Sequence, residues 1–578
     1  MPCPPVPNPS EKDMHRSFAI VALAASGLFA FTATATAETI TVCAVDCDHT
    51  SINAAIDASA DGDVIQLAAE TYQEGSVIDT VGKAITIQGT TGKDGAPTSI
   101  LDGANFHRIL QCTCGETETT IFKDLVIQNG QCQGGAGMRI EGSSPTMENC
   151  TFKDNTIDDG PCGTGLDEET GLGGGMAIRN GNPTVVDCRF IDNSSPLTGG
   201  GMSMIDDSRP ILRNCIFEGN YALAGDGGAA IYCMNSSAIT IESCVFNDSY
   251  TASFGGAILA KDSSNITILD CAFSGNHGYD GGAIFMWNCQ GGVMADCEFA
   301  GNECTEDGGA IYNWKCTGFS FTRCEFQGNE YGYLGGGVFN DDCSGLSFED
   351  CSFEGNVVRP DGSICHGGGI SNLGSSLAIM NCTFVDNQAY VGGGIWNSED
   401  STLDLQWCRF WCNQPDAIVG GILSGSDNCI NNDCVECPDL ANEDDDDDGV
   451  PNIDDICPGG DDNLDIDEDG TPDGCDGCPG DPFKTHPGNC GCGVDDSATF
   501  GDLDCDGDYD EDDIRLGMKD FGIIERARGD MDGDGDADRV DWEILGSELG
   551  ICVGDLNGDL QIDAADLGLL IGAWGLCP

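Results

Sequence analysis

Regularly spaced carboxylates near the carboxy terminus are the side chains of this sequence best suited to chemistry. Two twelve-residue stretches, beginning at Asp444 and Asp465, place oxygen-bearing side chains at positions 1, 3, 5, 9 and 12 and Gly at position 6. Ca²⁺ takes six to eight oxygen ligands, and a loop of this spacing can supply most of them, so the sequence predicts calcium as a cofactor. The candidate ligands are Asp444, Asp446, Asp448, Asn452 and Asp455 in the first stretch and Asp465, Asp467, Asp469, Asp473 and Asp476 in the second.

Three further acidic loops follow, and each runs into an apolar pattern typical of a helix, such as residues 567–574. Their spacing is that of the EF-hand loop, with Asp in place of the usual final Glu. The candidate ligands are Asp502, Asp504, Asp506, Asp510 and Asp513; Asp530, Asp532, Asp534, Asp538 and Asp541; and Asp555, Asn557, Asp559, Asp563 and Asp566.

These loops resemble two known families. The first two also carry Cys at position 14, Cys457 and Cys478, and resemble thrombospondin type 3 repeats. The later three resemble dockerin modules, which carry two loop–helix units and bind cohesins; here three loops are present, and Leu560 stands where Gly is expected. The resemblance implies a calcium-dependent tail with a cohesin-like protein as partner. A calcium-stabilised stalk and a solvated acidic linker are the alternatives.

A repeat occupies most of the remaining chain and would position any binding surface. Cys followed two residues later by Phe recurs at Cys150, Cys188, Cys215, Cys244, Cys271, Cys297, Cys324, Cys351, Cys382 and Cys408, with steps of 26 to 31 residues from Cys188 onward. Such a period marks a solenoid, in which coils stack about 4.8 Å apart and bury their apolar faces against one another. Asn follows the Cys by five residues in nine copies, as expected of a residue that tolerates left-handed turns and whose amides can stack. Ser249 replaces it in one copy, where we expect an irregular turn.

The combination of Gly-Gly-x-Ile with Phe-x-x-Asn resembles the repeat of polymorphic outer-membrane proteins, which is found on right-handed β-helices. Residues 39–102, with a helix pattern at 51–57, resemble the capped entry segment of secreted pectate-lyase-like β-helices. We therefore predict an all-β chain with a right-handed parallel β-helix. The predicted domains are a signal peptide at 1–37, the β-helix at 38–428, a Cys-rich linker at 429–443, thrombospondin type 3-like repeats at 444–500 and a dockerin-like module at 501–578.

The residue after each Gly-Gly-x-Ile motif should point outward, and it is aromatic in five of seven coils. Sugar rings stack on aromatic faces, so the sequence predicts a carbohydrate-binding strip. Its members are Tyr232, Phe285, Trp287, Tyr312, Trp314, Phe339 and Trp396. Alternatively, the strip lies under a loop or serves only strand packing. Asp226, Asp280 and Asp307 precede the glycines and are expected in register, as a calcium ladder or as turn residues.

The amino terminus and the cysteine content predict export. Arg16, an apolar run at 18–31 and the small residues Ala35 and Ala37 form a signal-peptide pattern, and no other stretch is apolar enough to cross a membrane. The 35 cysteines favour an oxidising compartment. We expect the repeated cysteines to be buried thiols, because parallel side chains fit a disulfide poorly. The expected disulfides are Cys43/Cys47, Cys112/Cys114 and Cys289/Cys316, with Cys429, Cys434 and Cys437 closing the last coil.

These observations predict a secreted or cell-surface protein that binds a polysaccharide or surface glycan, or acts as an adhesin. The net charge of −75 argues against nucleic acid or an anionic membrane as partner. A polysaccharide lyase or glycoside hydrolase of the pectate-lyase-like fold, carried by the dockerin-like module, is the alternative. No catalytic residue is assigned, because the few basic residues do not cluster and His277 and His366 read as solvated turn residues.

Overall fold

The structure is a computed structural model, and the described residues form one long β-solenoid and a short segment beyond it. The chain divides into two compact units, Met1–Pro438 and Asp439–Pro578, which are considered separately. Residues 1–36 of the predicted signal peptide, most of the thrombospondin type 3-like repeats and the whole dockerin-like module lie outside the described residues. Among the described residues, no helix is long and apolar enough to span a membrane. The described ranges are 37–157, 172–223, 225–330, 332–358, 365–420, 422–425, 428–431, 434, 464–467, 471–480 and 482.

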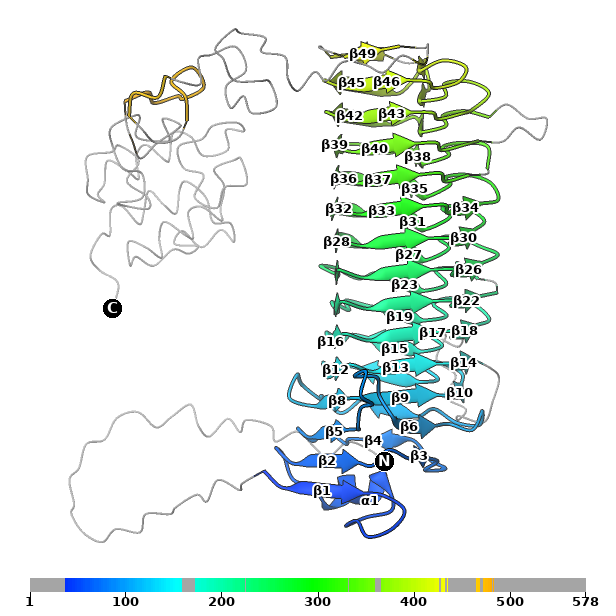
Figure 1. Cartoon of the computed structure of the whole chain (residues 1–578), viewed down its shortest axis with the longest axis vertical. Coiled ribbons are helices and arrows are strands. Elements are labelled where there is room, and N and C mark those ends of the chain that lie inside the picture. Colours follow the sequence, from blue (N-terminus) through cyan, green and yellow to red (C-terminus); the bar gives the residue numbers. More distant parts are fainter. Residues whose placement is uncertain are drawn as a thin grey trace, which may run out of the picture. The chain divides into compact units, whose positions relative to one another are not determined.

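Three parallel sheets run the length of the solenoid and a further, shorter one accompanies its middle coils, so that each coil adds one strand to most of them (Figure 1). The sheet whose outer face is considered below has 13 strands in the described residues. These are β4 (Ile78–Asp79), β7 (Leu110–Cys112), β11 (Met138–Glu141), β15 (Met176–Arg179), β19 (Met202–Ile205), β23 (Ile231–Met234), β27 (Ile258–Lys261), β31 (Ile284–Trp287), β35 (Ile311–Trp314), β38 (Val338–Asp341), β41 (Ile370–Leu373), β44 (Ile395–Asn397) and β47 (Ile418–Val419).

The Cys-x-Phe segments form a second sheet, of 14 described strands. They are β3 (Thr71–Tyr72), β6 (Ser99–Asp102), β9 (Leu125–Gln128), β13 (Thr151–Lys153), β17 (Arg189–Ile191), β21 (Ile216–Glu218), β25 (Val245–Asn247), β29 (Ala272–Ser274), β33 (Glu298–Ala300), β37 (Glu325–Gln327), β40 (Ser352–Glu354), β43 (Thr383–Val385), β46 (Arg409–Trp411) and β49 (Cys429–Ile430). A short sheet of seven strands follows it in the middle coils: β10 (Gln131–Cys132), β14 (Thr156–Ile157), β18 (Ser194–Ser195), β22 (Tyr221–Ala222), β26 (Tyr250–Thr251), β30 (His277–Gly278) and β34 (Glu303–Cys304).

The fourth sheet has 15 described strands and includes the first strand of the solenoid. Its strands are β1 (Thr39–Val42), β2 (Val64–Leu67), β5 (Thr86–Gln88), β8 (Ile121–Lys123), β12 (Thr146–Glu148), β16 (Thr184–Val186), β20 (Ile211–Arg213), β24 (Thr240–Glu242), β28 (Ser264–Leu269), β32 (Gln290–Ala295), β36 (Thr317–Thr322), β39 (Leu346–Glu349), β42 (Ser376–Met380), β45 (Thr402–Gln406) and β48 (Ile422–Ser424). All pairings between strands of successive coils are parallel, as the repeat predicted.

The phenylalanines of the repeat form a continuous column inside the solenoid. From Phe152 to Phe410, ring centroids of neighbouring coils lie 4.6–4.9 Å apart, with planes within 8° of parallel. Each ring is fully buried, because strand side chains alternate and this position faces inward in every coil. The predicted stacking of equivalent residues is therefore confirmed.

The repeated asparagines form a second buried column that holds the turns. In Asn329, for example, Nδ2 donates to Phe299 O of the preceding coil at 2.9 Å and to Asn356 Oδ1 of the following coil at 2.9 Å. The residue before the asparagine, such as Asp192 or Gly219, takes the positive φ of about 50–60°. The expected left-handed role of the Asn itself is therefore wrong, and its amide bonding is what the turn uses.

Ser249 interrupts the asparagine column without disturbing the coil. Its backbone N–H still donates to Asn276 Oδ1 at 3.1 Å, and strand pairing continues on both sides. The expectation of an irregular turn at this position is wrong, because the strand pairing and the bond from Ser249 N to the Asn276 side chain maintain the register there.

A short helix, α1 (Ile52–Ala58), covers the first coil, as predicted (Figure 1). Ser51 caps it by accepting a hydrogen bond from Ala54 N, and Lys83 Nζ donates to Ser59 O at 2.7 Å just beyond its carboxy end. Ile52 and Ile56 are buried and join the main core. The helix thereby shields apolar side chains that a bare terminal coil would expose.

The cysteine predictions are confirmed in part. The ten cysteines of the repeat are buried and carry no disulfide, Cys43 bonds to Cys47, and Cys434 bonds to Cys412 of the last coils. The pairs Cys112/Cys114 and Cys289/Cys316 are wrong, because Cys112, Cys289 and Cys316 are free thiols. Cys289 and Cys316 lie on successive rungs with their side chains parallel, and parallel side chains fit the torsion of a disulfide poorly.

Replacing Asn329 by Ala should destabilise the solenoid, because it removes the buried hydrogen bond to Phe299 O and the bonds that the backbone N–H and side-chain amide of Asn302 donate to Asn329 Oδ1. Since each such loss costs about 1–3 kcal/mol, we expect the free energy of unfolding to fall by roughly 2–4 kcal/mol. Calorimetry and denaturant unfolding measure this change. Gln327→Ala, at an exposed position of the same turn region, is the control, and an equal effect of both substitutions would refute the structural role of the amide column.

Candidate functional site

The outer face of the 13-stranded sheet carries the predicted aromatic residues other than Trp287 and Trp314 in a single column. Strand pairing aligns Tyr232 with Leu259, then Phe285, Tyr312, Phe339, Ser371 and finally Trp396. Neighbouring rings contact one another, with 4.8 Å between the centroids of Phe285 and Tyr312 and 4.6 Å between those of Tyr312 and Phe339. The sequence therefore predicted correctly that these side chains share one face.

This column is buried, so the prediction of a bare aromatic strip is wrong for most of its members. Tyr232, Phe285 and Phe339 are at most 3 % exposed. Residues that precede the glycine turns cover them: Phe254 stacks on Phe285 at 4.9 Å, and Leu334 packs on the same cluster. The alternative that the strip lies under a loop is the one the structure supports, because these turns fold back over the sheet.

Three tryptophans of the predicted set keep partial exposure: Trp287, Trp314 and Trp396. The rings of Trp287 and Trp314 lie on successive strands, β31 and β35, with centroids 4.8 Å apart. Lys261 Nζ lies 4.0 Å from the centroid of Trp287, and Lys315 Nζ lies 4.9 Å from that of Trp314. The ammonium group of Lys261 thus lies over one face of Trp287, and the two partly exposed indoles contact each other.

Asp280 and Asp307 form a half-buried carboxyl pair in the turns that cover the aromatic column, at positions aligned with Phe254 and Leu334. Asp307 N donates to Asp280 Oδ1 at 3.1 Å, and Asp307 Oδ1 is buried with no hydrogen-bond partner. Burial raises the pKa of Asp280 to about 6. Burial, with the charges of Asp280 and Glu306, raises the pKa of Asp307 to about 7. Carboxyls with pKa values near neutrality can both donate and accept a proton, as general acid–base chemistry requires.

Asp226 does not belong to this pair, so the predicted three-residue register is wrong. The bridges join Gly227 to Phe254 and Phe254 to Asp280, which places Asp226 one residue out of step. Gly227 and Ile231 match Phe254 and Ile258 with equal spacing, so the Gly-Gly pair of this coil begins one register position earlier and Gly227, not Asp226, aligns with the Asp280 position. The Asp226 carboxylate instead contacts Lys261 Nζ at 3.0 Å and accepts from the Tyr232 hydroxyl at 3.3 Å.

His366 and His277 are not simple solvated turn residues. His366 stacks on Trp396 with 4.3 Å between centroids, its Nδ1 is buried without a hydrogen-bond partner, and burial lowers its pKa. His277 stacks on Tyr250 at 5.0 Å, and Tyr250 on Tyr221 at 5.5 Å, on the seven-stranded sheet. The sequence analysis did not identify this partly exposed stack. The signal was present, because Tyr221, Tyr250 and His277 stand at equivalent positions of successive repeats.

Part of the second predicted calcium loop is described. Asp473 Oδ1 accepts from Ile466 N at 2.8 Å, which closes the loop. Asp476 is 7 % exposed; its Oδ1 accepts from Cys478 N at 2.7 Å, and its Oδ2 is buried without a hydrogen-bond partner. A buried carboxylate oxygen left in this state fits a cation ligand. The described members of the predicted set are Asp465, Asp467, Asp473 and Asp476; all its other calcium-ligand residues lie outside the described part.

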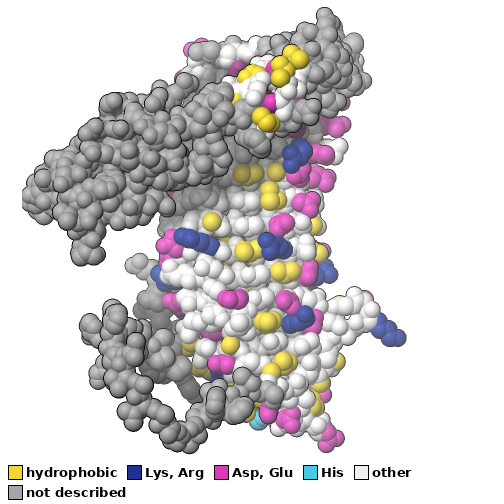
Figure 2. All heavy atoms as spheres, turned by 90° about the vertical axis from the view of Figure 1, so that its left-hand side faces the viewer, with side chains coloured by type: hydrophobic (Ala, Val, Ile, Leu, Met, Phe, Trp, Pro, Cys, Tyr) yellow, Lys and Arg dark blue, Asp and Glu magenta, His cyan; other side chains and the backbone are white. Residues whose placement is uncertain are grey.

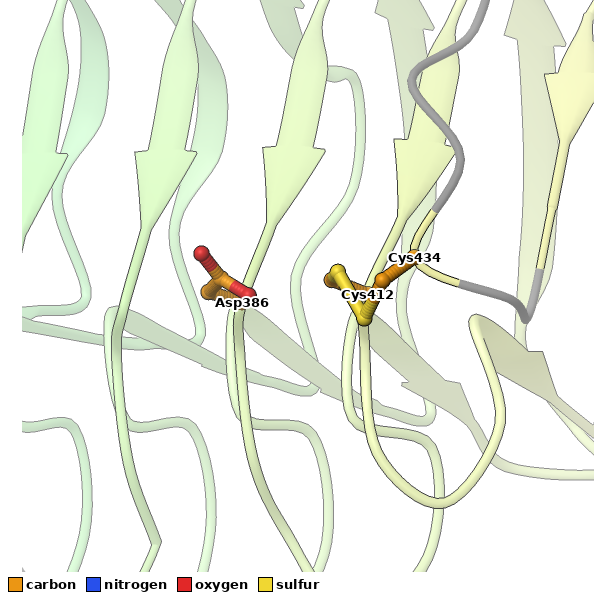
Figure 3. Close-up of side chains that lie close together, drawn as sticks. All are labelled: Asp386, Cys412 and Cys434. Atoms are coloured by element: carbon orange, nitrogen blue, oxygen red, sulfur yellow. A yellow bond between two sulfur atoms is a disulfide. The ribbon is translucent and has the colours of Figure 1, made fainter.

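Two other groups of possible metal ligands occur among the described residues, and neither suits a metal. Asp386 lies beside Cys412 and Cys434, but the two sulfur atoms form a disulfide (Figure 3). Asp79 and Glu116 lie near Cys114, which is also disulfide-bonded. Disulfide sulfurs are not thiolate ligands, and Glu116 is already held by Thr80, Gly82, Cys114 and Ser143.

The face over the 15-stranded sheet is chemically different. Figure 2 shows acidic, basic and apolar side chains interspersed there, without a broad apolar patch. Ion pairs join neighbouring coils, including Lys123–Glu148 and Arg213–Glu242 at 2.7 Å each. Exposed pairs of this kind stabilise little and mark an ordinary solvated surface.

The comparison with protein families agrees with this architecture. A family model described as the right-handed beta helix region matches residues 96–254 and 252–435. Similar solved structures include the A-module of the Azotobacter vinelandii mannuronan C-5 epimerase AlgE6 (14 % identity, 66 % of this chain and 94 % of that chain, TM-score 0.31). PfbA, a surface adhesin of Streptococcus pneumoniae, has 13 % identity over 65 % of this chain and 86 % of that chain (TM-score 0.31). A PL6 alginate lyase in complex with a trisaccharide has 13 % identity over 65 % and 84 % (TM-score 0.36). No curated protein matches the sequence.

The raised pKa of Asp307 should make the stability of the solenoid depend on pH. The folded protein takes up this proton near pH 7 and the unfolded chain only near pH 4, so stability falls as the pH rises from about 4 to 7. Asp307→Asn should therefore raise the free energy of unfolding by roughly 1–3 kcal/mol at pH 8 and by less at pH 5. Asp296→Asn removes an equal charge from an exposed ion pair with Arg323. Equal pH profiles of the two variants would contradict the assignment.

Proposed function

Because the chain belongs to the family of right-handed β-helix region proteins, we propose that its solenoid is a polysaccharide-binding scaffold. The protein is exported through the signal peptide at 1–37 and acts outside the cell or at its surface. Its binding site is the partly exposed tryptophan surface on the 13-stranded sheet rather than the whole aromatic column. The calcium-dependent tail, residues 444–578, attaches the scaffold to a cohesin-like protein.

The observation that carries this proposal is the pair formed by Trp287 and Trp314. Successive strands place two partly exposed indole rings 4.8 Å apart, and the apolar faces of sugar rings pack on such surfaces. A half-buried polar group that can bond to sugar hydroxyls borders the pair: the carboxylate of Asp341, which is aligned with Trp314 on the next strand. A few convergent polar groups beside an apolar surface are what a sugar site requires.

The calcium proposal rests on the loop around Asp476. Its buried and unpartnered Oδ2 would remain desolvated without a cation, and a divalent ion would compensate both the burial and the repulsion among the neighbouring carboxylates. The ion would be held by Asp465, Asp467, Asp473 and Asp476, and it would order a segment whose acidic composition opposes compact folding.

A glycoside hydrolase is the second candidate, favoured by the pKa values of Asp280 and Asp307. Hydrolysis of a glycosidic bond uses two carboxyl groups, one of which donates a proton to the leaving oxygen. This pair lies in the turns that cover the aromatic column of the 13-stranded sheet, and carboxyls with pKa values of about 6 and 7 are partly protonated at neutral pH. Release of new reducing ends from a bound polysaccharide, lost in Asp307→Asn, would establish this candidate over simple binding.

Replacing Trp287 or Trp314 by Ala should weaken polysaccharide binding. Each substitution removes a stacking surface worth about 1 kcal/mol or more, so we expect Kd to rise roughly tenfold, measured by calorimetry with ligands identified on a glycan array. Trp411→Ala is the matched control, because Trp411 is also partly exposed but lies on the Cys-x-Phe sheet. If all three variants bind equally, the site is elsewhere.

Removing calcium should abolish one thermal transition of the full-length protein and leave that of the solenoid in place. The carboxylates of the tail repel one another once the ions are gone, so calorimetry with EDTA should lose the transition of residues 444–578. Asp476→Asn should lower the calcium affinity, whereas Glu399→Gln, on the exposed surface of the solenoid, should not. An unchanged trace with EDTA would count against the proposal.

A further inference from the structure

The ten cysteines of the repeat form a continuous column of buried thiols, here called the thiol column. Its members lie on ten successive coils, none forms a disulfide, and each is at most 2 % exposed. Their backbones are aligned, since Cys150 N donates to Cys188 Sγ at 3.4 Å and Cys351 N to Cys382 Sγ at 3.3 Å. The column ends where Asn428 takes the next rung and accepts from Cys408 N at 2.8 Å.

The spacing of the column matches a metal ion bound between two sulfurs. The phenylalanine rings two residues along the same strands show rungs 4.6–4.9 Å apart. Two metal–thiolate bonds of about 2.3 Å in a straight line span about 4.6 Å. A disulfide would instead require neighbouring sulfurs to approach to about 2.05 Å, which the parallel rungs oppose. A bridging ion therefore fits the column with little movement of the backbone.

The backbone does not need sulfur at these positions. A second column in the same solenoid contains both serine and cysteine at equivalent positions. Its members are Ser236, Ser263, Cys289, Cys316, Cys343, Ser375 and Ser401. There Cys343 N donates to Ser375 Oγ at 2.8 Å and Ser375 N to Ser401 Oγ at 3.0 Å, so a hydroxyl accepts the same bond. The thiol column nevertheless carries sulfur on every rung, and sulfur is the ligand that selects soft cations.

We propose that the thiol column binds soft, two-coordinate monovalent cations of the Cu(I) class, each held between the sulfur atoms of two successive rungs. One S–H bond breaks for each ion, its proton passes to solvent, and no electron is transferred. One thiolate and one thiol then hold one positive charge, so the buried unit is neutral, as a dry interior favours. Ten sulfurs used two at a time hold five ions, which enter when neighbouring rungs open locally.

The test uses the full-length protein with Ag(I), an analogue of Cu(I), added without oxygen. Two variants each replace five cysteines by Ser. The alternate variant changes Cys188, Cys244, Cys297, Cys351 and Cys408 and leaves no two thiols on neighbouring rungs. The block variant changes Cys150, Cys188, Cys215, Cys244 and Cys271 and leaves five consecutive thiols, enough for two pairs. Thiols elsewhere are the same in all three proteins and cancel in the comparison.

We expect the wild type to bind five more silver ions than the alternate variant, and the block variant to bind two more. X-ray absorption should show two sulfur ligands at about 2.3–2.4 Å, with the β-sheet circular dichroism unchanged. Equal uptake by the two variants, no uptake by the folded wild type, or uptake only with loss of β-sheet would overturn the proposal. Should these variants not fold, Cys271→Ser must lose one ion relative to Cys112→Ser, since Cys112 is a buried thiol outside the column.

Discussion

The parallel hydrogen bonds between successive coils are the constraint on which this structure depends. They hold each residue of a repeat directly above its counterpart, so that every choice of side chain is repeated along the solenoid as a column. A side chain that packs well on its counterparts therefore stabilises every coil of the repeat. A side chain that packs poorly weakens the contacts with both adjacent coils. Phe152 to Phe410 and Asn155 to Asn413 show the result, with stacked rings and linked amides throughout the core. Ser249 shows the limit, because the backbone retains the register where one amide is missing.

The same constraint explains why the outer face of the 13-stranded sheet differs from a plain solenoid wall. Aromatic residues on successive strands would expose a continuous apolar surface, which soluble domains rarely leave bare. Turns that fold back over the sheet, through Phe254 and Leu334, cover most of it and leave the Trp287–Trp314 pair at its margin. These turns also bury Asp280 and Asp307, whose raised pKa values follow from the removal of water around two neighbouring carboxyls. The same turns therefore determine both which aromatic surface stays exposed and which carboxyl groups have raised pKa values.

The sulfur chemistry follows from geometry as well. Thiols on successive rungs are near one another yet held parallel, so Cys289 and Cys316 remain reduced, while Cys43 and Cys47, in a loop free to bend, are joined. Cys412 and Cys434 show the same contrast at the far end, where the regular repeat stops. Oxidation state in this chain is therefore decided by whether the backbone leaves two sulfurs free to approach.

The sequence by itself determined the solenoid, its inward columns and the capping helix, because a period of about 27 residues and strand alternation act on local spacing that can be read directly. It also indicated which residues share the outer face. Only the tertiary structure decided which of them meet solvent, since Tyr232 and Phe339 are covered by turns from elsewhere in their own and neighbouring coils. It likewise decided that Asp226 stands apart from Asp280, because the Gly-Gly pair of that coil begins one register position earlier and places Gly227 where Asp280 stands two coils later. Burial and register depend on how neighbouring coils pack together. The spacing of residues along the chain does not determine which side chains of other turns cover a given position.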